Sequence, residues 1–106
     1  MMSIPGSWLA ATIASGGASS AEVDLGRSYD LIEIQIPTLD TATTLKVQTA
    51  EVTGGTFRDL GDSVTTTAGT HNYNDVWEIG GWQFIKIVAD NSQDAERLIR
   101  VRGWAY

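Results

Sequence analysis

The side chains that most often carry out chemistry are few in this sequence. The one histidine, His71, lies in the polar stretch His71-Asn-Tyr-Asn-Asp75, where a loop on a rigid scaffold could hold a general base or a metal ligand. A catalytic triad also needs a nucleophile and an orienting acid, and a metal site needs several ligands at matched spacing. Neither set accompanies His71. We therefore expect an ordinary surface loop here, and a small hydrolase built on His71 is the alternative.

Oxygen donors gather in one turn near the C-terminus, at Asp90, Asn91 and Asp94. A calcium loop of the Asp-x-Asp-x-Asp-Gly type with a later bidentate glutamate is not present around them, so we assign these residues to turn geometry. The chain has no cysteine, which excludes disulfides, thiolate zinc sites and cysteine nucleophiles. The sequence thus predicts no catalytic residue, no metal and no cofactor, and hence a protein that is not an enzyme.

Aromatic and arginine side chains form the remaining candidate set. Tryptophan and tyrosine on a β-sheet surface can stack on sugar rings, but they are also enriched in cores and subunit interfaces, which we favour here. Alternation along the last expected strand puts Arg100 and Arg102 on one face and Arg97 on the other. We expect these arginines on a solvated face or in salt bridges with acidic neighbours. The candidate interface residues are Trp8, Tyr73, Trp77, Trp82, Trp104, Tyr106, Arg100 and Arg102.

Size and charge limit the classes of partner. The 106 residues fit one domain with one hydrophobic core. Thirteen acidic and seven basic side chains give a net charge of −6, which disfavours nucleic acid because phosphate neutralisation supplies much of that affinity. No run of eighteen apolar residues is present, so we expect no membrane-spanning helix. The expected partners are therefore proteins.

Apolar and polar residues alternate along most of the chain, which is the period of β-strands. Between the strands, residues 26–30 are expected to form a turn, residues 68–75 a loop, and Gly80-Gly81 a break. The most apolar stretch, 82–89, is expected to be a central strand buried on both faces. The expected strands are 21–25, 31–36, 44–49, 56–60, 63–67, 76–79, 82–89 and 97–104.

This spacing predicts an all-β protein, an antiparallel β-sandwich of jelly-roll-like form with seven or eight short strands. Residues 21–106 would form the sandwich domain, and residues 1–20 an N-terminal strand or an arm that reaches a neighbour. A domain this small without disulfides or metal gains stability when partners bind its folded form. We therefore expect a homo-oligomer, either a dimer or a trimer.

Three segments carry a resemblance to a known class of proteins. Leu31-Ile-Glu-Ile-Gln-Ile-Pro37, Thr44-Leu-Lys-Val-Gln-Thr49 and Gly55-Thr-Phe-Arg-Asp-Leu60 resemble the pattern of small β-sandwich virion proteins of tailed bacteriophages. Phe84-Ile-Lys-Ile-Val-Ala89 and Leu98-Ile-Arg-Val-Arg102 continue the pattern, so the resemblance covers most of the chain from Ala21 onward.

The resemblance rests on a rhythm of apolar residues and contains no catalytic signature. It implies a structural protein of the virion, foremost a capsid decoration (cement) protein. Such a protein stabilises the phage head through contacts with the major capsid protein or other virion proteins. The chain would assemble in the host cytoplasm and lie on the capsid surface. A carbohydrate-binding module and a tail or baseplate accessory that binds a receptor are the alternatives.

Overall fold

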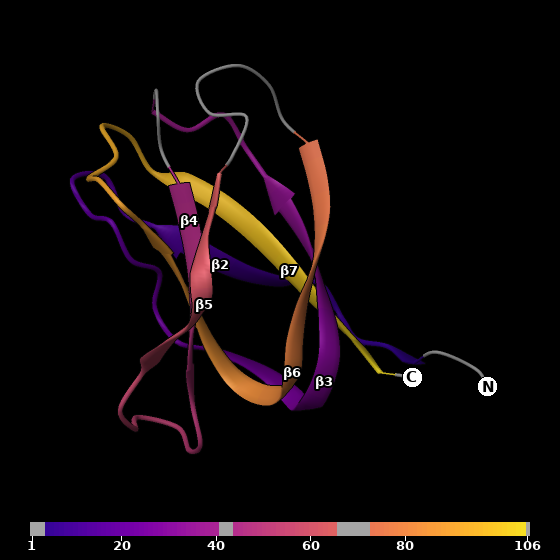
Figure 1. Ribbon diagram of the computed structural model, residues 1–106. Helices are drawn as coiled ribbons and strands as arrows, with labels where there is room; N and C mark the ends of the chain where they lie inside the picture. Colours follow the sequence, from indigo (N-terminus) through magenta and orange to yellow (C-terminus); the bar gives the residue numbers. More distant parts are fainter. Residues whose placement is uncertain (1–3, 41–43, 66–72, 106) are drawn as a thin grey trace.

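A computed structural model describes residues 4–40, 44–65 and 73–105, and every element in this part of the chain is a β-strand (Figure 1). Two strands are long, β3 with 14 residues and β6 with 17. The strands are β1 (Ile4–Pro5), β2 (Leu9–Ile13), β3 (Val23–Ile36), β4 (Thr44–Ala50), β5 (Arg58–Thr65), β6 (Tyr73–Ala89) and β7 (Arg97–Ala105). The prediction of an all-β chain is therefore confirmed.

The seven strands form one continuous antiparallel sheet. Its order is β1-β7-β3-β6-β4-β5, and β2 also pairs with β7. Each of the two long strands, which pair with each other, also pairs with a second strand. The end of β3 pairs with β7, and the second half of β6 pairs with β4. The division into two separate stacked sheets that a sandwich or jelly roll requires is not confirmed, because hydrogen bonds connect all seven strands into one sheet.

Glycines let β3 and β6 bend without ending. Gly26 has a φ of +90°, and Gly80 and Gly81 have φ of +73° and +100°, a region that residues with a side chain rarely adopt. The ladder between the two strands shifts register beside these glycines, on either side of Tyr29. Both strands turn sharply at the same end of the molecule (Figure 1).

Four sequence expectations on strand ends were wrong, two of them because of these bends. The expected turn at 26–30 and the break at Gly80-Gly81 are bends inside continuous strands, since the backbone hydrogen bonds resume beyond them. The expected strands 56–60 and 63–67 are one strand, β5. Of the expected loop 68–75, residues 73–75 belong to β6, and the rest lies outside the described residues.

The bends wrap one face of the sheet around a single core. Even-numbered residues of the second half of β3 point inward, and so do the odd-numbered residues of β7, as alternation requires. One cluster joins side chains from β2, β3, β4, β6 and β7, which a flat sheet of this width would hold apart. Its fully buried members include Ile13, Ile32, Ile34, Leu45, Ile85, Ile87, Ile99 and Val101. For β6 the expected burial on both faces was wrong, because Phe84, Lys86 and Val88 are only half-buried.

Close packing of Tyr29 fixes β7 against the bend of β3. The tyrosine is buried, and its ring lies so near the backbone of Gly103 that a Cβ atom at that position would overlap the ring atoms. A Cβ atom at Gly6 would lie 2.8 Å from the hydroxyl oxygen of the same ring. The amide of Gly6 donates to the carbonyl of Gly103 at 2.8 Å, so both glycines are required where the N-terminal segment meets β7.

An ion-pair network holds the turn before β7. Nη2 of Arg97 lies 2.7 Å from Oδ1 of Asp40 and 2.8 Å from Oδ1 of Asp94. The backbone amide of Asp94 donates to Asp40, and Oδ1 of Asp90 accepts from the amide of Thr44. The carboxylates of Asp90 and Asp94 therefore bind groups of the protein itself, a backbone amide and an arginine. No group of three or more metal-ligating side chains is found in the part of the chain that the structure describes.

Two further carboxylates of β3 and its approach fasten neighbouring segments. Glu22 accepts hydrogen bonds from the Thr53 hydroxyl at 2.6 Å and the Gly54 amide at 2.7 Å, and these hold its pKa below the ordinary value. The hydrogen bond from the Gln83 side chain, followed by that from the Gly26 amide, lowers the pKa of Asp24. Both carboxylates therefore contribute to the fold in their charged form.

Candidate interaction surface

The outward face of β7 carries four large side chains in sequence. Leu98, Arg100, Arg102 and Trp104 point away from the core, because the odd residues between them point into it. This confirms the predicted parity, with Arg100 and Arg102 on one face and Arg97 on the other.

Neighbouring strands extend this surface sideways. Register places Glu33 of β3 directly opposite Arg102, and Val76 of β6 lies opposite Glu33 on its other side. On the β2 side, Ala10 lies opposite Arg100 and Thr12 opposite Leu98. Cross-strand neighbours of this kind have side chains in contact distance. We call the set Trp8, Glu33, Val76, Leu98, Arg100, Arg102 and Trp104 the tryptophan–arginine face.

Arg102 is the centre of this face. Its guanidinium carbon lies 4.6 Å from the ring centroid of Trp8 and 5.0 Å from that of Trp104, so the cation is stacked between two indoles. Its Nη2 lies 2.7 Å from Oε1 of Glu33, and the indole N–H of Trp104 donates to the same oxygen. One carboxylate therefore holds both the arginine and a tryptophan in place, and the arrangement exists before any partner binds.

Apolar and cationic groups remain open to solvent around this centre. Val76 is 55% exposed and Leu98 is 54% exposed, values that are high for large apolar side chains. Arg100 is exposed, and its guanidinium carbon lies 5.8 Å from the ring of Trp8. Tryptophan, arginine and exposed aliphatic groups on a rigid sheet are the components of protein–protein contact surfaces.

The aromatic residues predicted to form an interface lie in different parts of the structure. Trp8 and Trp104 lie on the tryptophan–arginine face, but Trp77 belongs to the core, where its indole N–H donates to Asp75 at 3.0 Å. Trp82 is half-buried at the bend of β6. His71, Tyr106 and the side chain of Tyr73 lie outside the described residues.

Sequence reasoning missed Glu33, Val76 and Leu98 as members of the face. From the sequence alone, Glu33 is expected to be a solvated strand residue, and only the strand register places Arg102 opposite it. For Leu98 a signal was present, because it shares the even numbering of Arg100 and Arg102 on an alternating strand.

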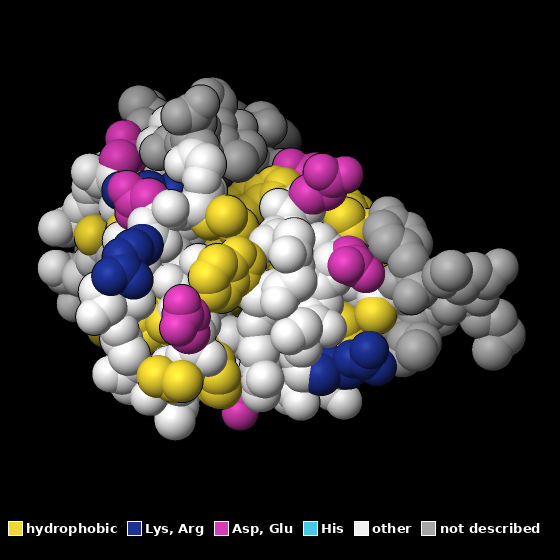
Figure 2. All heavy atoms as spheres, turned by 60° about the horizontal axis from the view of Figure 1, so that its bottom comes forward, with side chains coloured by type: hydrophobic (Ala, Val, Ile, Leu, Met, Phe, Trp, Pro, Cys, Tyr) yellow, Lys and Arg dark blue, Asp and Glu magenta, His cyan; other side chains and the backbone are white. Residues whose placement is uncertain are grey.

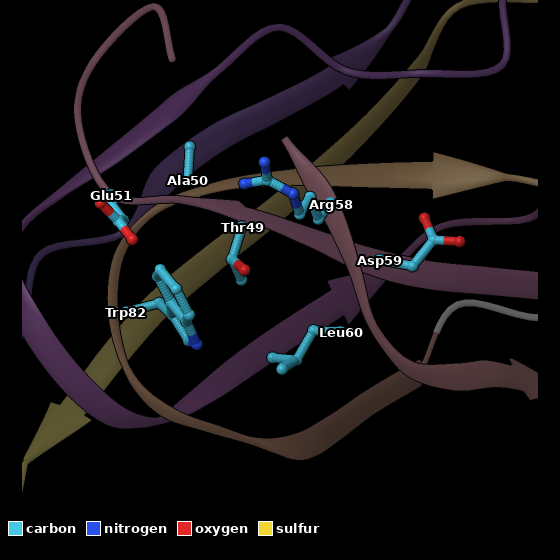
Figure 3. Close-up of a pocket in the computed structure, with 7 residues that line it drawn as sticks. All are labelled: Thr49, Ala50, Glu51, Arg58, Asp59, Leu60 and Trp82. Carbon is cyan, nitrogen blue, oxygen red and sulfur yellow. The ribbon is translucent and has the colours of Figure 1, made fainter. Parts of the chain in front are cut away.

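A second feature, a shallow pocket of about 210 Å³, lies between the β4–β5 hairpin and the bend of β6. Figure 3 shows Thr49 and Leu60 beside the ring of Trp82, whereas the carboxylate of Asp59 points away from it. In Figure 2, the bend and the hairpin turn come forward, and hydrophobic side chains gather at the middle of this face among scattered carboxylates. The pocket is lined by Thr49, Ala50, Glu51, Arg58, Asp59, Leu60 and Trp82.

The charged side chains around the pocket differ in whether they already have a binding partner within the protein. The hydrogen bonds from Gln48 at 2.9 Å and from Lys46 at 3.0 Å hold the pKa of Asp59 below its ordinary range, so this carboxylate is already occupied. Arg58 and Glu51 form no ion pair with any described residue. One positive and one negative group are thus available at the pocket rim.

Comparison with known proteins establishes the fold. No protein family and no curated protein matches the sequence. The chain is similar in structure to the SPBc2 prophage-derived protein YomS, with a TM-score of 0.65 over 99% of this chain and 96% of that one. The two share a fold. Their sequences are only 12% identical, so the likeness extends to the fold alone.

A weaker likeness joins the chain to a protein of the Bacillus endospore appendages, disulfide-linked pili, at 15% identity. It covers 99% of this chain and 88% of that one with a TM-score of 0.38, which does not establish a common fold. Within the described residues, no helix is long and apolar enough to span a membrane.

Proposed function

We propose that this chain is a non-enzymatic structural protein of a bacteriophage-type particle and acts through protein–protein contacts made by its tryptophan–arginine face. The observation that carries the proposal is the stacked Arg102 between Trp8 and Trp104, with exposed Val76 and Leu98 beside it. Because Glu33 already holds Arg102 and Trp104, these two side chains lose little conformational entropy when a partner covers them. The fold that the chain shares with the prophage-derived YomS supports a phage-type particle.

Within this class, the role of a capsid decoration protein is the specific form that we propose. The partner is then the major capsid protein or another virion protein, and the chain lies on the outside of the head. The face suits this role because its ion pair between Arg102 and Glu33 is neutral overall, which leaves Arg100 to meet an acidic group on the partner. A homo-oligomer on the particle is part of the same proposal.

Binding to particles tests the proposal directly. Purified chain is mixed at micromolar concentration with phage heads assembled without it, and the heads are pelleted. Val76→Asp and Arg100→Glu are expected to reduce the bound fraction at least tenfold, because each places an acidic group in the contact.

Matched controls carry the same substitutions elsewhere. Val52→Asp changes a valine that is 60% exposed on the β4–β5 turn, and Arg27→Glu changes an exposed arginine at the bend of β3. Both controls are expected to pellet like the unaltered chain. Absence of the unaltered chain from the pellet, or equal binding by Val76→Asp and Val52→Asp, would refute the proposal.

A further inference from the structure

The pocket beside Trp82 contains a threonine hydroxyl that binds no other described residue. Three polar residues of the described chain are buried: Ser20, Thr49 and Gln93. The Ser20 hydroxyl and the Gln93 amide bind backbone groups at 2.9 to 3.2 Å. Thr49 is only 5% exposed and lines the pocket, yet its hydroxyl has no hydrogen-bond partner among the described residues.

Among the described residues, the buried side-chain polar atoms without a partner are Nε of Arg97 and Nε of Arg102, so the Thr49 hydroxyl oxygen is itself open to solvent although the residue as a whole is buried. Val47, the neighbour of Thr49 on the same face of β4, shows that a β-branched apolar side chain fits this side of the strand. A threonine at position 49 thus adds a hydroxyl that the protein itself does not use. The hydroxyl is placed to bind a group that enters the pocket.

The other walls indicate the chemistry of that group. Trp82 offers an aromatic surface and an indole N–H that donates to no described residue. Gly80 and Gly81 precede it in the sequence, and a Cβ atom at either position would meet nothing within 4 Å. Arg58 and Glu51 add one donor group and one acceptor group of opposite charge at the rim, so the pocket favours a ligand without net charge.

Volume limits the ligand to a single ring. Sites for drug-sized molecules measure about 300–1,000 Å³, and this pocket measures about 210 Å³. A neutral ring with one apolar face and hydroxyls around its edge satisfies the aromatic wall, the Thr49 hydroxyl and the two charged groups together. We propose that this pocket binds one pyranose unit of a glycan, with the sugar ring against Trp82 and a sugar hydroxyl bonded to Thr49.

The test is a titration of the full chain with a panel of methyl pyranosides, methyl glucoside, galactoside, mannoside and N-acetylglucosaminide, up to tens of millimolar. Binding is followed in nitrogen–proton correlation spectra. We expect one sugar to shift the indole N–H signal of Trp82 and the amide signals of Thr49 and Leu60 in a saturable manner. The indole signals of Trp8 and Trp104 are expected not to move.

Two variants assign the effect to the pocket. Thr49→Val keeps the shape of the side chain and should weaken binding roughly three- to tenfold, the effect of one lost hydrogen bond. Its urea midpoint should not fall, because the hydroxyl has no partner in the free protein. Trp82→Leu should abolish the saturable shifts, and Trp104→Phe, outside the pocket, should leave them unchanged.

Three results would overturn the proposal. The first is the absence of any saturable shift at Trp82 with the whole panel, and the second is equal affinity of the Thr49→Val variant. The third is a shift caused by p-cresol, a mimic of a tyrosine side chain, when no sugar causes one, because the pocket then receives a side chain of a protein partner. These outcomes are independent of the particle-binding experiment, which depends on the opposite set of tryptophans.

Discussion

Replacement of Gly103 by alanine tests how β7, the strand that carries Arg102 and Trp104, is seated on the core. A Cβ atom at this position would overlap the ring of Tyr29, which is buried and confined on its hydroxyl side by Gly6. Because neither the ring nor the paired strand can move away freely, we expect a loss at the upper end of overpacking effects, about 3 kcal/mol. For a domain of this size the loss lowers Tm by roughly 12–20 °C.

Urea unfolding followed by tryptophan fluorescence measures this loss, since the chain has four tryptophans. The control is a double-mutant cycle with Tyr29→Leu, which removes the ring that the new methyl group meets. The two changes should couple by about 1 kcal/mol or more, so that Gly103→Ala costs much less in the Tyr29→Leu background. A Gly103→Ala variant within 0.5 kcal/mol of the unaltered chain, or an equal cost in both backgrounds, would refute the reasoning.

Three further predictions concern single features of the fold. Arg102→Met should cost only about 1 kcal/mol in urea unfolding, since the pair is partly exposed, but it should raise acrylamide quenching of Trp8; unchanged quenching would show that the guanidinium does not cover the ring. Gly80→Ala should destabilise the chain by about 1 kcal/mol or more because of the positive φ, and a stabilising effect would contradict the bend. Glu22, Asp24 and Asp59 have pKa values in the folded chain below the ordinary 4.5 for glutamate and 3.8 for aspartate. Their contribution to the free energy of unfolding is therefore complete at neutral pH and is lost as the pH falls through the folded values. The urea midpoint should therefore decline below about pH 4.5, and a midpoint that rises on acidification would contradict the assignment, which involves Glu22, Asp24 and Asp59.

Alternation alone predicted much of the sheet. The inward set Ile32, Ile34 and Ile36 is buried as expected, and the last strand places Arg100 and Arg102 outside. These outcomes follow from a local rule, because successive side chains of a strand point to opposite faces.

Long-range features escaped this reasoning. The sequence predicts strand ends at Gly26 and at Gly80-Gly81. In the structure, hydrogen bonds to strands far away in sequence continue β3 and β6 beyond these bends. Whether a glycine ends a strand or bends it depends on those distant partners, which a single sequence does not reveal.

The candidate surfaces were predicted in part. Residue types pointed to Trp8, Trp104 and the two arginines, but Glu33 joins them only through the register between β3 and β7. The pocket depends on a contact between the β4–β5 hairpin and Trp82, residues separated by more than twenty positions. Neither the unpaired state of the Thr49 hydroxyl nor the core position of Trp77 is visible without these contacts.

Hydroxyl-radical footprinting of the chain on assembled particles tests the role of the tryptophan–arginine face most directly. Oxidation of Trp8 and Trp104 is compared between bound and free chain, with Trp82 as the internal reference because it lies outside the face. We expect both face tryptophans to be oxidised several times more slowly in the bound chain, while Trp82 reacts at the same rate in both. Equal oxidation of Trp8 and Trp104 in bound and free chain would contradict the account.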